Sequence, residues 1–193
     1  MTRHSTLLTA LALAAFAASA GAQSTTQAGA ASPAAAPAGP DVGQPAPDFT
    51  AAWADSSGAR STPVSLASLR GKVVVLAFYP KDRTSGCTAE LTKFRDQYGK
   101  LFGDGVVVLP ISADSIPSHV SWASEAKFPF ALVSDPQLAA ADLYGSHMAG
   151  RPVANRTVFV VGKDGRIAWR EMKFNALNED AYTALAAAVA KAR

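Results

Sequence analysis

The chain has 193 residues, of which 49% are hydrophobic and 17% charged, and this is enough apolar material for one substantial core. The formal net charge is only +3, and the basic residues are scattered rather than gathered in a stripe with aromatic side chains. These features argue against a nucleic-acid partner.

Residues 1–22 have the layout of a cleaved secretory signal. Arg3 and His4 precede an apolar run that ends at Ala18, and small residues follow. The run is short and rich in alanine, whereas a membrane span needs roughly 20 apolar residues. We therefore expect export, with the periplasm as the destination, and no membrane attachment after cleavage.

Residues 23–41 consist almost wholly of Ala, Pro, Gly, Ser, Thr and Gln. Such a segment buries too little side chain to offset the entropy of ordering it, which predicts a disordered leader. The remainder, 42–193, has roughly the 150 residues usual for one compact domain.

The first half of this domain predicts strands alternating with helices. Residues 49–53 and 63–66 bracket a Ser/Gly turn, which indicates a small edge hairpin. The continuous apolar run 73–79 is typical of a strand buried on both faces. Helical spacing of apolar residues then predicts a helix over 88–102, followed by a strand over 106–111. Pro110 within that strand indicates a bend or an edge near its end.

The second half continues the alternation, with a helix at 115–127 and a short strand at 130–133. A helix opening at Asp135 and Pro136 ends near Gly145. A hairpin joins 157–161 to 166–170 across a Gly-containing turn, and a last helix spans 178–191. This order implies an α/β fold with a mixed central sheet and helices on both faces, compatible with a thioredoxin-like three-layer fold.

Cys87 is the only cysteine, so this chain cannot form an internal disulfide. Three interpretations remain from the count: a small buried hydrophobe, half of an intermolecular disulfide, or a reactive thiol. The local context favours the third, because Cys87 follows a buried strand and falls in the first turn of a helix. Unpaired backbone N–H groups and the helix dipole stabilise a thiolate there. The Thr84 hydroxyl and the amides of Gly86 and Cys87 form a pocket suited to a bound molecule with two adjacent oxygens.

Pro80, Thr84 and Cys87 match the Pro-x-x-x-Thr/Ser-x-x-Cys signature, and in this the chain resembles the peroxiredoxins. The stretch 78–90 is most similar to the peroxiredoxin Q or bacterioferritin-comigratory branch. Weaker matches keep the branch's order as far as Arg156, so that the resemblance covers about 42–193.

The resemblance implies a thiol-dependent peroxidase acting in antioxidant defence on hydrogen peroxide and organic hydroperoxides. Cys87 would attack the peroxide and become a sulfenic acid. Arg156 would stabilise the thiolate and orient the peroxide, Thr84 would hydrogen-bond the peroxide, and Pro80 would shield the thiolate from water. Glu90 is a supporting residue expected to pair with an arginine or with the helix start. Neither a metal nor an organic cofactor is implied.

The sequence departs from the branch at two positions. Thr92 stands where many members carry a resolving cysteine, and Ser85 stands where proline is usual before Gly86. The first departure implies a one-cysteine cycle in which Cys87 is reduced by an external thiol. The reductant would be a small thiol, a thioredoxin- or glutaredoxin-like protein, or a second copy of this chain. The protein is expected to be a monomer or a homodimer. The second departure is expected only to loosen the loop.

Two other functions compete with this one: an envelope thiol:disulfide oxidoreductase and a non-enzymatic redox-sensing module. The first needs a second cysteine near Cys87, and the sequence supplies none. Arg95 is either a helper of the site or part of a solvated helix face. His119 and His147 lack companion ligands at metal spacing and are expected to be structural or exposed.

Overall fold

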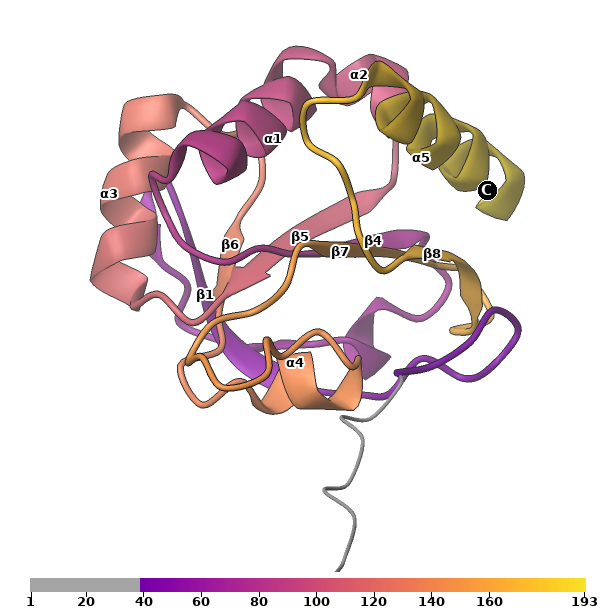
Figure 1. The fold of residues 1–193 in the computed structure, drawn as a ribbon, viewed down its shortest axis with the longest axis horizontal. Helices are drawn as coiled ribbons and strands as arrows, with labels where there is room; N and C mark the ends of the chain where they lie inside the picture. The colour runs from indigo at the N-terminus through magenta and orange to yellow at the C-terminus, as the bar shows by residue number, and fades with distance from the viewer. Residues whose placement is uncertain (1–38) are drawn as a thin grey trace, which may run out of the picture. The chain divides into compact units, whose positions relative to one another are not determined.

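The computed structural model describes residues 39–193, which build a mixed sheet flanked by helices (Figure 1). The predicted signal, 1–22, and nearly all of the predicted leader, 23–41, lie outside the described residues. The strands are β1 (Thr50–Asp55), β2 (Gly58–Ala59), β3 (Val64–Ser65), β4 (Val74–Phe78), β5 (Val107–Ser112), β6 (Leu132–Ser134), β7 (Thr157–Val161) and β8 (Ile167–Glu171). The helices are η1 (Ala67–Leu69), α1 (Ser85–Asp96), α2 (Tyr98–Leu101), α3 (Ile116–Ala126), α4 (Ala139–Leu143) and α5 (Glu179–Ala192).

The strand order across the sheet is β2-β1-β6-β5-β4-β7-β8, with β3 paired to β1 outside this path. β4 runs parallel to β5 and antiparallel to β7. Every residue of β4 is buried, as its uninterrupted apolar sequence predicts for a central strand. The predicted mixed sheet is therefore confirmed, and its centre is the strand that leads into Cys87.

The two faces of the sheet carry different helices, because successive side chains of a strand point to opposite sides. Val75 and Ala77 of β4 pack in a cluster with residues of α1, α2, α3 and α5. Leu76 and Phe78 pack in a second cluster with residues of α4. Figure 1 shows α1, α2 and α5 on one side of the sheet and α4 on the other, so the predicted three layers are confirmed.

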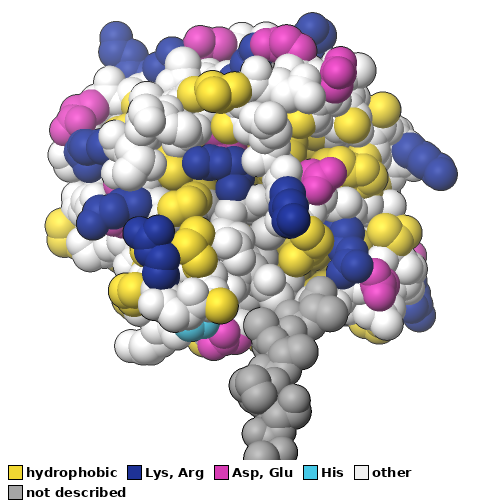
Figure 2. Space-filling model, in the orientation of Figure 1, with side chains coloured by type: hydrophobic (Ala, Val, Ile, Leu, Met, Phe, Trp, Pro, Cys, Tyr) yellow, Lys and Arg dark blue, Asp and Glu magenta, His cyan; other side chains and the backbone are white. Residues whose placement is uncertain are grey.

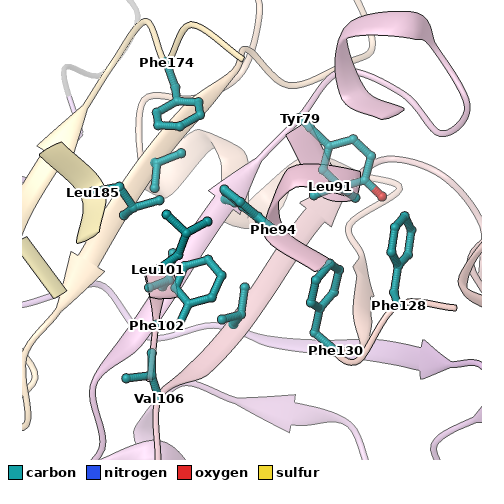
Figure 3. Packing of buried hydrophobic residues seen from close by; sticks show 14 of the residues in the cluster. Tyr79, Leu91, Phe94, Leu101, Phe102, Val106, Phe128, Phe130, Phe174 and Leu185 are labelled. Carbon is teal, nitrogen blue, oxygen red and sulfur yellow. The ribbon is translucent and has the colours of Figure 1, made fainter. Parts of the chain in front are cut away.

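Aromatic side chains fill the layer between the sheet and α1. The Phe94 and Phe102 rings meet edge to face with centroids 5.2 Å apart, and Phe128 stacks on Phe130 at 5.1 Å (Figure 3). Such pairs stabilise a core beyond the area that they bury. This packing fixes α1, and therefore Cys87, against the sheet.

The N-terminal hairpin forms one edge of the sheet. β1 pairs with β3 as predicted, but it also pairs antiparallel with β6. The predicted small edge hairpin is therefore confirmed, whereas its pairing with β6 was not predicted, since alternation in a short segment does not reveal a distant partner strand. Pro110 is accommodated because β6 pairs with β5 only at Ile111 and Ser112.

Two helices differ from their predicted bounds. The helix expected over 88–102 begins at Ser85 and breaks at Gln97 into α1 and α2. The helix expected from Asp135 begins only at Ala139, because Leu138 has a left-handed backbone with φ 57°. The Asp135 side chain still accepts a hydrogen bond from the Ala141 amide at 2.9 Å. It therefore caps the first turn of α4 although it lies outside the helix.

The later hairpin and the last helix follow the sequence closely. β7 and β8 pair antiparallel across a turn closed by the Gly165 amide, which donates to the Gly162 carbonyl at 2.8 Å. Asn178 caps α5 by accepting from the Asp180 amide at 3.0 Å. On the face in Figure 2, basic side chains are interspersed with acidic and apolar ones.

Candidate active site

Cys87 is the third residue of α1, the helix that follows β4 after a short loop, and its side chain is fully buried. Thr84 precedes the helix with an extended backbone, and its carbonyl accepts from the Thr88 amide at 2.8 Å to close the first turn. Among residues 39–193, no side chain caps this helix start. The first N–H groups of α1 therefore remain able to donate to an anion beside the thiol.

Arg156 immediately precedes β7, and its side chain reaches Cys87 from there. Its Nη2 atom donates to the Cys87 Sγ at 3.3 Å, although the two residues are 69 positions apart. Gly86 makes this approach possible, because a Cβ atom there would lie 3.0 Å from the same Nη2 atom. The adjacency of β7 and β4 in the sheet places the arginine over the helix start.

Glu90 completes the group one turn along α1. Its Oε2 atom accepts from Nη1 of Arg156, and its other oxygen, Oε1, has no hydrogen-bond partner within residues 39–193. Burial raises the pKa of Glu90 to about 7, although the charge and the hydrogen bond of Arg156 act in the opposite direction. Arg156 thus joins a buried carboxyl group to the thiol.

The remaining two predicted residues lie in the loop between β4 and α1. Thr84 is exposed at the helix start, and its hydroxyl donates to the Lys81 carbonyl at 3.0 Å. With its proton committed in this way, the Thr84 oxygen keeps lone pairs with which it can accept a hydrogen bond. Pro80 is half-buried directly after β4.

The structure thus brings Cys87, Arg156, Glu90 and Gly86 into one constellation, with Thr84 and Pro80 in the adjoining loop. Arg95 lies outside it, since it binds Asp96 and the Ala126 carbonyl.

The two histidines differ in their surroundings. His119 is fully buried and hydrogen-bonded on both ring nitrogens, which confirms a structural position. His147 is partly exposed and binds Asp142.

Sequence reasoning missed two features next to the site. Asp82 is buried beneath the loop and binds Tyr79, Ser118 and His119. An acidic residue in a short loop next to a nucleophile was the available signal. The second feature is a groove beside Gly86 and Arg156, whose far wall is the segment 172–177. No motif marks this segment, although Leu177 is 82% exposed.

A profile of the AhpC/TSA family matches residues 42–170. The chain belongs to the AhpC/TSA family. It is 38% identical over 141 residues to a Bcp peroxiredoxin of Coxiella burnetii, covering 69% of this chain and 90% of that one. It is 31% identical over 144 residues to peroxiredoxin Bcp of Bacillus subtilis, covering 69% and 87%.

Solved structures of this AhpC/TSA family show the same fold. Peroxidoxin BcpB from Mycobacterium tuberculosis aligns with a TM-score of 0.67 at 26% identity, covering 80% of this chain and 99% of that one. The resemblance to Bcp-type peroxiredoxins and to peroxiredoxin Q is therefore confirmed, and so is the class of enzyme, a thiol peroxidase of antioxidant defence.

The described residues contain neither a metal-ligand cluster nor a membrane-spanning helix. Within 39–193, no group of three or more His, Cys, Asp and Glu side chains could hold a metal ion. No helix in the same range is long and apolar enough to cross a membrane.

Proposed function

We propose that this AhpC/TSA protein is an exported one-cysteine peroxidase that reduces hydrogen peroxide and organic hydroperoxides with electrons from an external thiol. The observation that carries the proposal is the 3.3 Å hydrogen bond from Arg156 to the Cys87 sulfur at the start of α1. A guanidinium and a helix start both favour an anionic sulfur, which is the nucleophilic form of cysteine.

In the first step the Cys87 thiolate attacks one oxygen of the peroxide ROOH. The S–O bond forms while the O–O bond breaks, so that sulfur is oxidised to a sulfenic acid and RO⁻ leaves, which takes a proton from water to become ROH. Arg156 and the amides of Gly86 and Cys87 donate to the oxygens as charge develops on the leaving group. The Thr84 oxygen accepts a hydrogen bond from the peroxide O–H, since the Thr84 hydroxyl itself donates to the Lys81 carbonyl.

In the second step an external thiol R′SH condenses with the sulfenic acid, releasing water and leaving a mixed disulfide on Cys87. A second thiol displaces the thiolate of Cys87 and leaves as the disulfide R′SSR′. The need for an outside reductant follows from the cysteine count, because no second thiol exists in the sequence. The groove lined by Gly86 and Arg156 adjoins the residue before Cys87, and it is the side from which hydroperoxide and reductant would approach the sulfur.

Export to the periplasm is the second part of the proposal. It is supported by the charged start, apolar run and small residues of 1–22, followed by the Ala/Pro-rich segment. Fractionation of cells expressing the whole chain, with N-terminal sequencing of the product, tests it. A mature chain that begins after residue 22 and is released with the periplasm is expected, whereas an uncleaved cytosolic chain would contradict export.

Peroxide turnover with defined reductants tests the enzymatic part. The wild-type protein should consume hydrogen peroxide with a small thiol or a thioredoxin system, and Cys87→Ser should abolish consumption. Intact-mass measurement after one equivalent of peroxide should show one added oxygen, replaced by a mixed disulfide when a thiol is added. Full activity in Cys87→Ser would refute the assignment. A thiol:disulfide oxidoreductase would instead reduce disulfide substrates without consuming peroxide.

A further inference from the structure

We propose that Asp82 and His119 form a buried ion pair that positions the loop bearing Pro80 and Thr84, so that peroxide attack by Cys87 depends on it. This inference rests on the proposed function and adds two positioning residues to it. Neither residue belongs to the constellation around the thiol, and His119 lies on α3 rather than on the loop or α1.

The loop is held through one inward-facing residue. Lys81, Arg83 and Thr84 are exposed, whereas Asp82 is only 7% exposed. Its backbone N–H donates to the Asp114 carboxylate at 2.8 Å, just beyond the end of β5. The loop is therefore attached to the sheet by its main chain and to the interior by the Asp82 side chain.

The Asp82 carboxylate accepts three hydrogen bonds. The Tyr79 hydroxyl donates to Oδ1 at 2.7 Å, while Ser118 and His119 lie 2.6 Å and 3.0 Å from Oδ2. Burial raises the pKa of Asp82, but the hydrogen bonds and the charge of its partners outweigh burial and leave the pKa lowered. The buried carboxyl is thus held as an anion, which needs a nearby cation.

His119 supplies that cation on geometric grounds. Its Nδ1 atom faces the Asp82 carboxylate, and its Nε2 atom faces the Val133 carbonyl at 3.3 Å. Both partners can only accept, and the ring is fully buried, so each nitrogen must carry a proton to be satisfied. The ring is then an imidazolium. The other titratable groups packed against the pair are Tyr79, which donates to Asp82, and Asp114, which binds the Asp82 amide.

The position of this pair bears on the chemistry through Lys81. The Lys81 carbonyl accepts a hydrogen bond from the Thr84 hydroxyl. This bond orients the hydroxyl and therefore its lone pairs, which face a bound peroxide. Lys81 is bonded directly to Asp82, so a displaced Asp82 moves that carbonyl together with Pro80 on its other side. A misplacement of about 1 Å in such a site can cost about a hundredfold in rate.

A second contact between the loop and α3 provides a matched control. Arg83 has a left-handed backbone with φ 61° and binds Glu125 at 3.0 Å, but both side chains are exposed. Exposed pairs contribute little. Glu125→Gln therefore weakens a surface contact between the same two segments while leaving the buried pair intact.

The test compares Asp82→Asn, His119→Gln and Glu125→Gln by stopped-flow oxidation with hydrogen peroxide. The first two should lose at least tenfold in the second-order rate, and Glu125→Gln should stay within twofold of wild type. The double variant Asp82→Asn/His119→Gln should be no slower than either single variant, because the two residues act as a unit. The rate at which a small thiol reduces the preformed sulfenic acid should be unchanged, which a general loss of structure would not allow.

Nitrogen-15 spectra of the wild-type imidazoles give a readout that does not depend on activity, and both nitrogens of His119 should be protonated at neutral pH. A neutral His119 ring, or a wild-type peroxide rate in folded Asp82→Asn, overturns the inference. If either variant fails to fold, Ser118→Ala removes one hydrogen bond to Asp82 and should still slow peroxide attack severalfold. An unchanged rate in Ser118→Ala would also overturn the inference. If the wild-type protein does not react with peroxide, the proposed function itself is refuted. Failure of the proposed function is therefore distinguishable from failure of this inference.

Discussion

Arg156 donates a 3.3 Å hydrogen bond to the Cys87 sulfur while its other terminal nitrogen binds the buried Glu90 carboxylate. One guanidinium therefore links the thiol and a buried acid on the same helix. The link exists because β7, which follows Arg156, lies beside β4, which leads to Cys87. Changes at any of the three residues should therefore affect the other two.

Arg156→Ala should lower the second-order rate with hydrogen peroxide by about 10²–10³, the usual cost of losing a donor to a developing anion. The same change leaves Glu90 buried and unpaired, which costs about 3–5 kcal/mol of folding free energy.

A second substitution separates these two losses. Adding Glu90→Gln to Arg156→Ala removes the unpaired charge and should restore much of the unfolding free energy but none of the peroxide rate. Recovery of the rate together with stability would mean that Arg156 acts only by holding the fold.

Gly86→Ala should lower the rate with peroxide without lowering the unfolding free energy. The new Cβ atom would meet the Arg156 Nη2 atom at 3.0 Å and displace the guanidinium, so we expect a loss of about tenfold in peroxide rate. Alanine in a helix is favoured over glycine by roughly 0.5–1 kcal/mol, so the unfolding free energy should not fall. Stopped-flow oxidation and urea unfolding of one preparation measure both.

Gly99→Ala is the matched control, because Gly99 lies in α2 and, apart from its neighbours in the chain and the helix's own backbone, no described atom comes within 4 Å of the added Cβ. It should leave peroxide reactivity unchanged. Equal slowing in both variants would show that the close approach of Arg156 to Gly86 has no bearing on attack.

Much of this site could be predicted from local sequence. Cys87, Thr84 and Pro80 lie within eight positions, and the strand before them and the helix after them have clear periodicity. Arg156 was predicted only through the family resemblance, because its contact with Cys87 depends on the pairing of β7 with β4, which composition does not encode. The Asp82–His119 pair was missed for the same reason, as its two halves come from a loop and from α3.

The fold shows the same division. The buried strand β4 and the β7–β8 hairpin were predicted closely because their signals are local. The pairing of β1 with β6 and the late start of α4 were not, since one requires a distant partner strand and the other a left-handed Leu138. Non-glycine residues with positive φ leave little trace in sequence.

Glu90 should make stability fall as pH rises. Its pKa is raised to about 7 in the folded protein, from an ordinary value of 4.5, so the folded state binds more protons in this window. The unfolding free energy should therefore decrease between about pH 4.5 and pH 7, by at most about 3 kcal/mol from this residue. Urea unfolding at about pH 5 and about pH 8 measures the decrease.

Glu90→Gln isolates that contribution, because the amide cannot ionise and the other carboxyl groups are common to both proteins. The unfolding free energy of the variant minus that of wild type should therefore increase as the pH rises. A constant difference across the range would mean that the folded Glu90 titrates near its ordinary value.

Thr92→Cys should convert the external cycle into an internal one. Thr92 lies five residues after Cys87 on α1, about 7.5 Å along the helix axis, beyond the roughly 7 Å that a disulfide tolerates. A bond between the two sulfurs therefore requires the start of α1 to unwind. After one equivalent of peroxide, intact mass should show loss of two hydrogens rather than gain of one oxygen, with a parallel loss of helical circular dichroism. Thr88→Cys places the same thiol beside Cys87 and should retain the sulfenic acid. If Thr92→Cys also retained it, α1 would be too rigid to open, and reductants would have to reach the sulfur through the groove beside Gly86 with the helix intact.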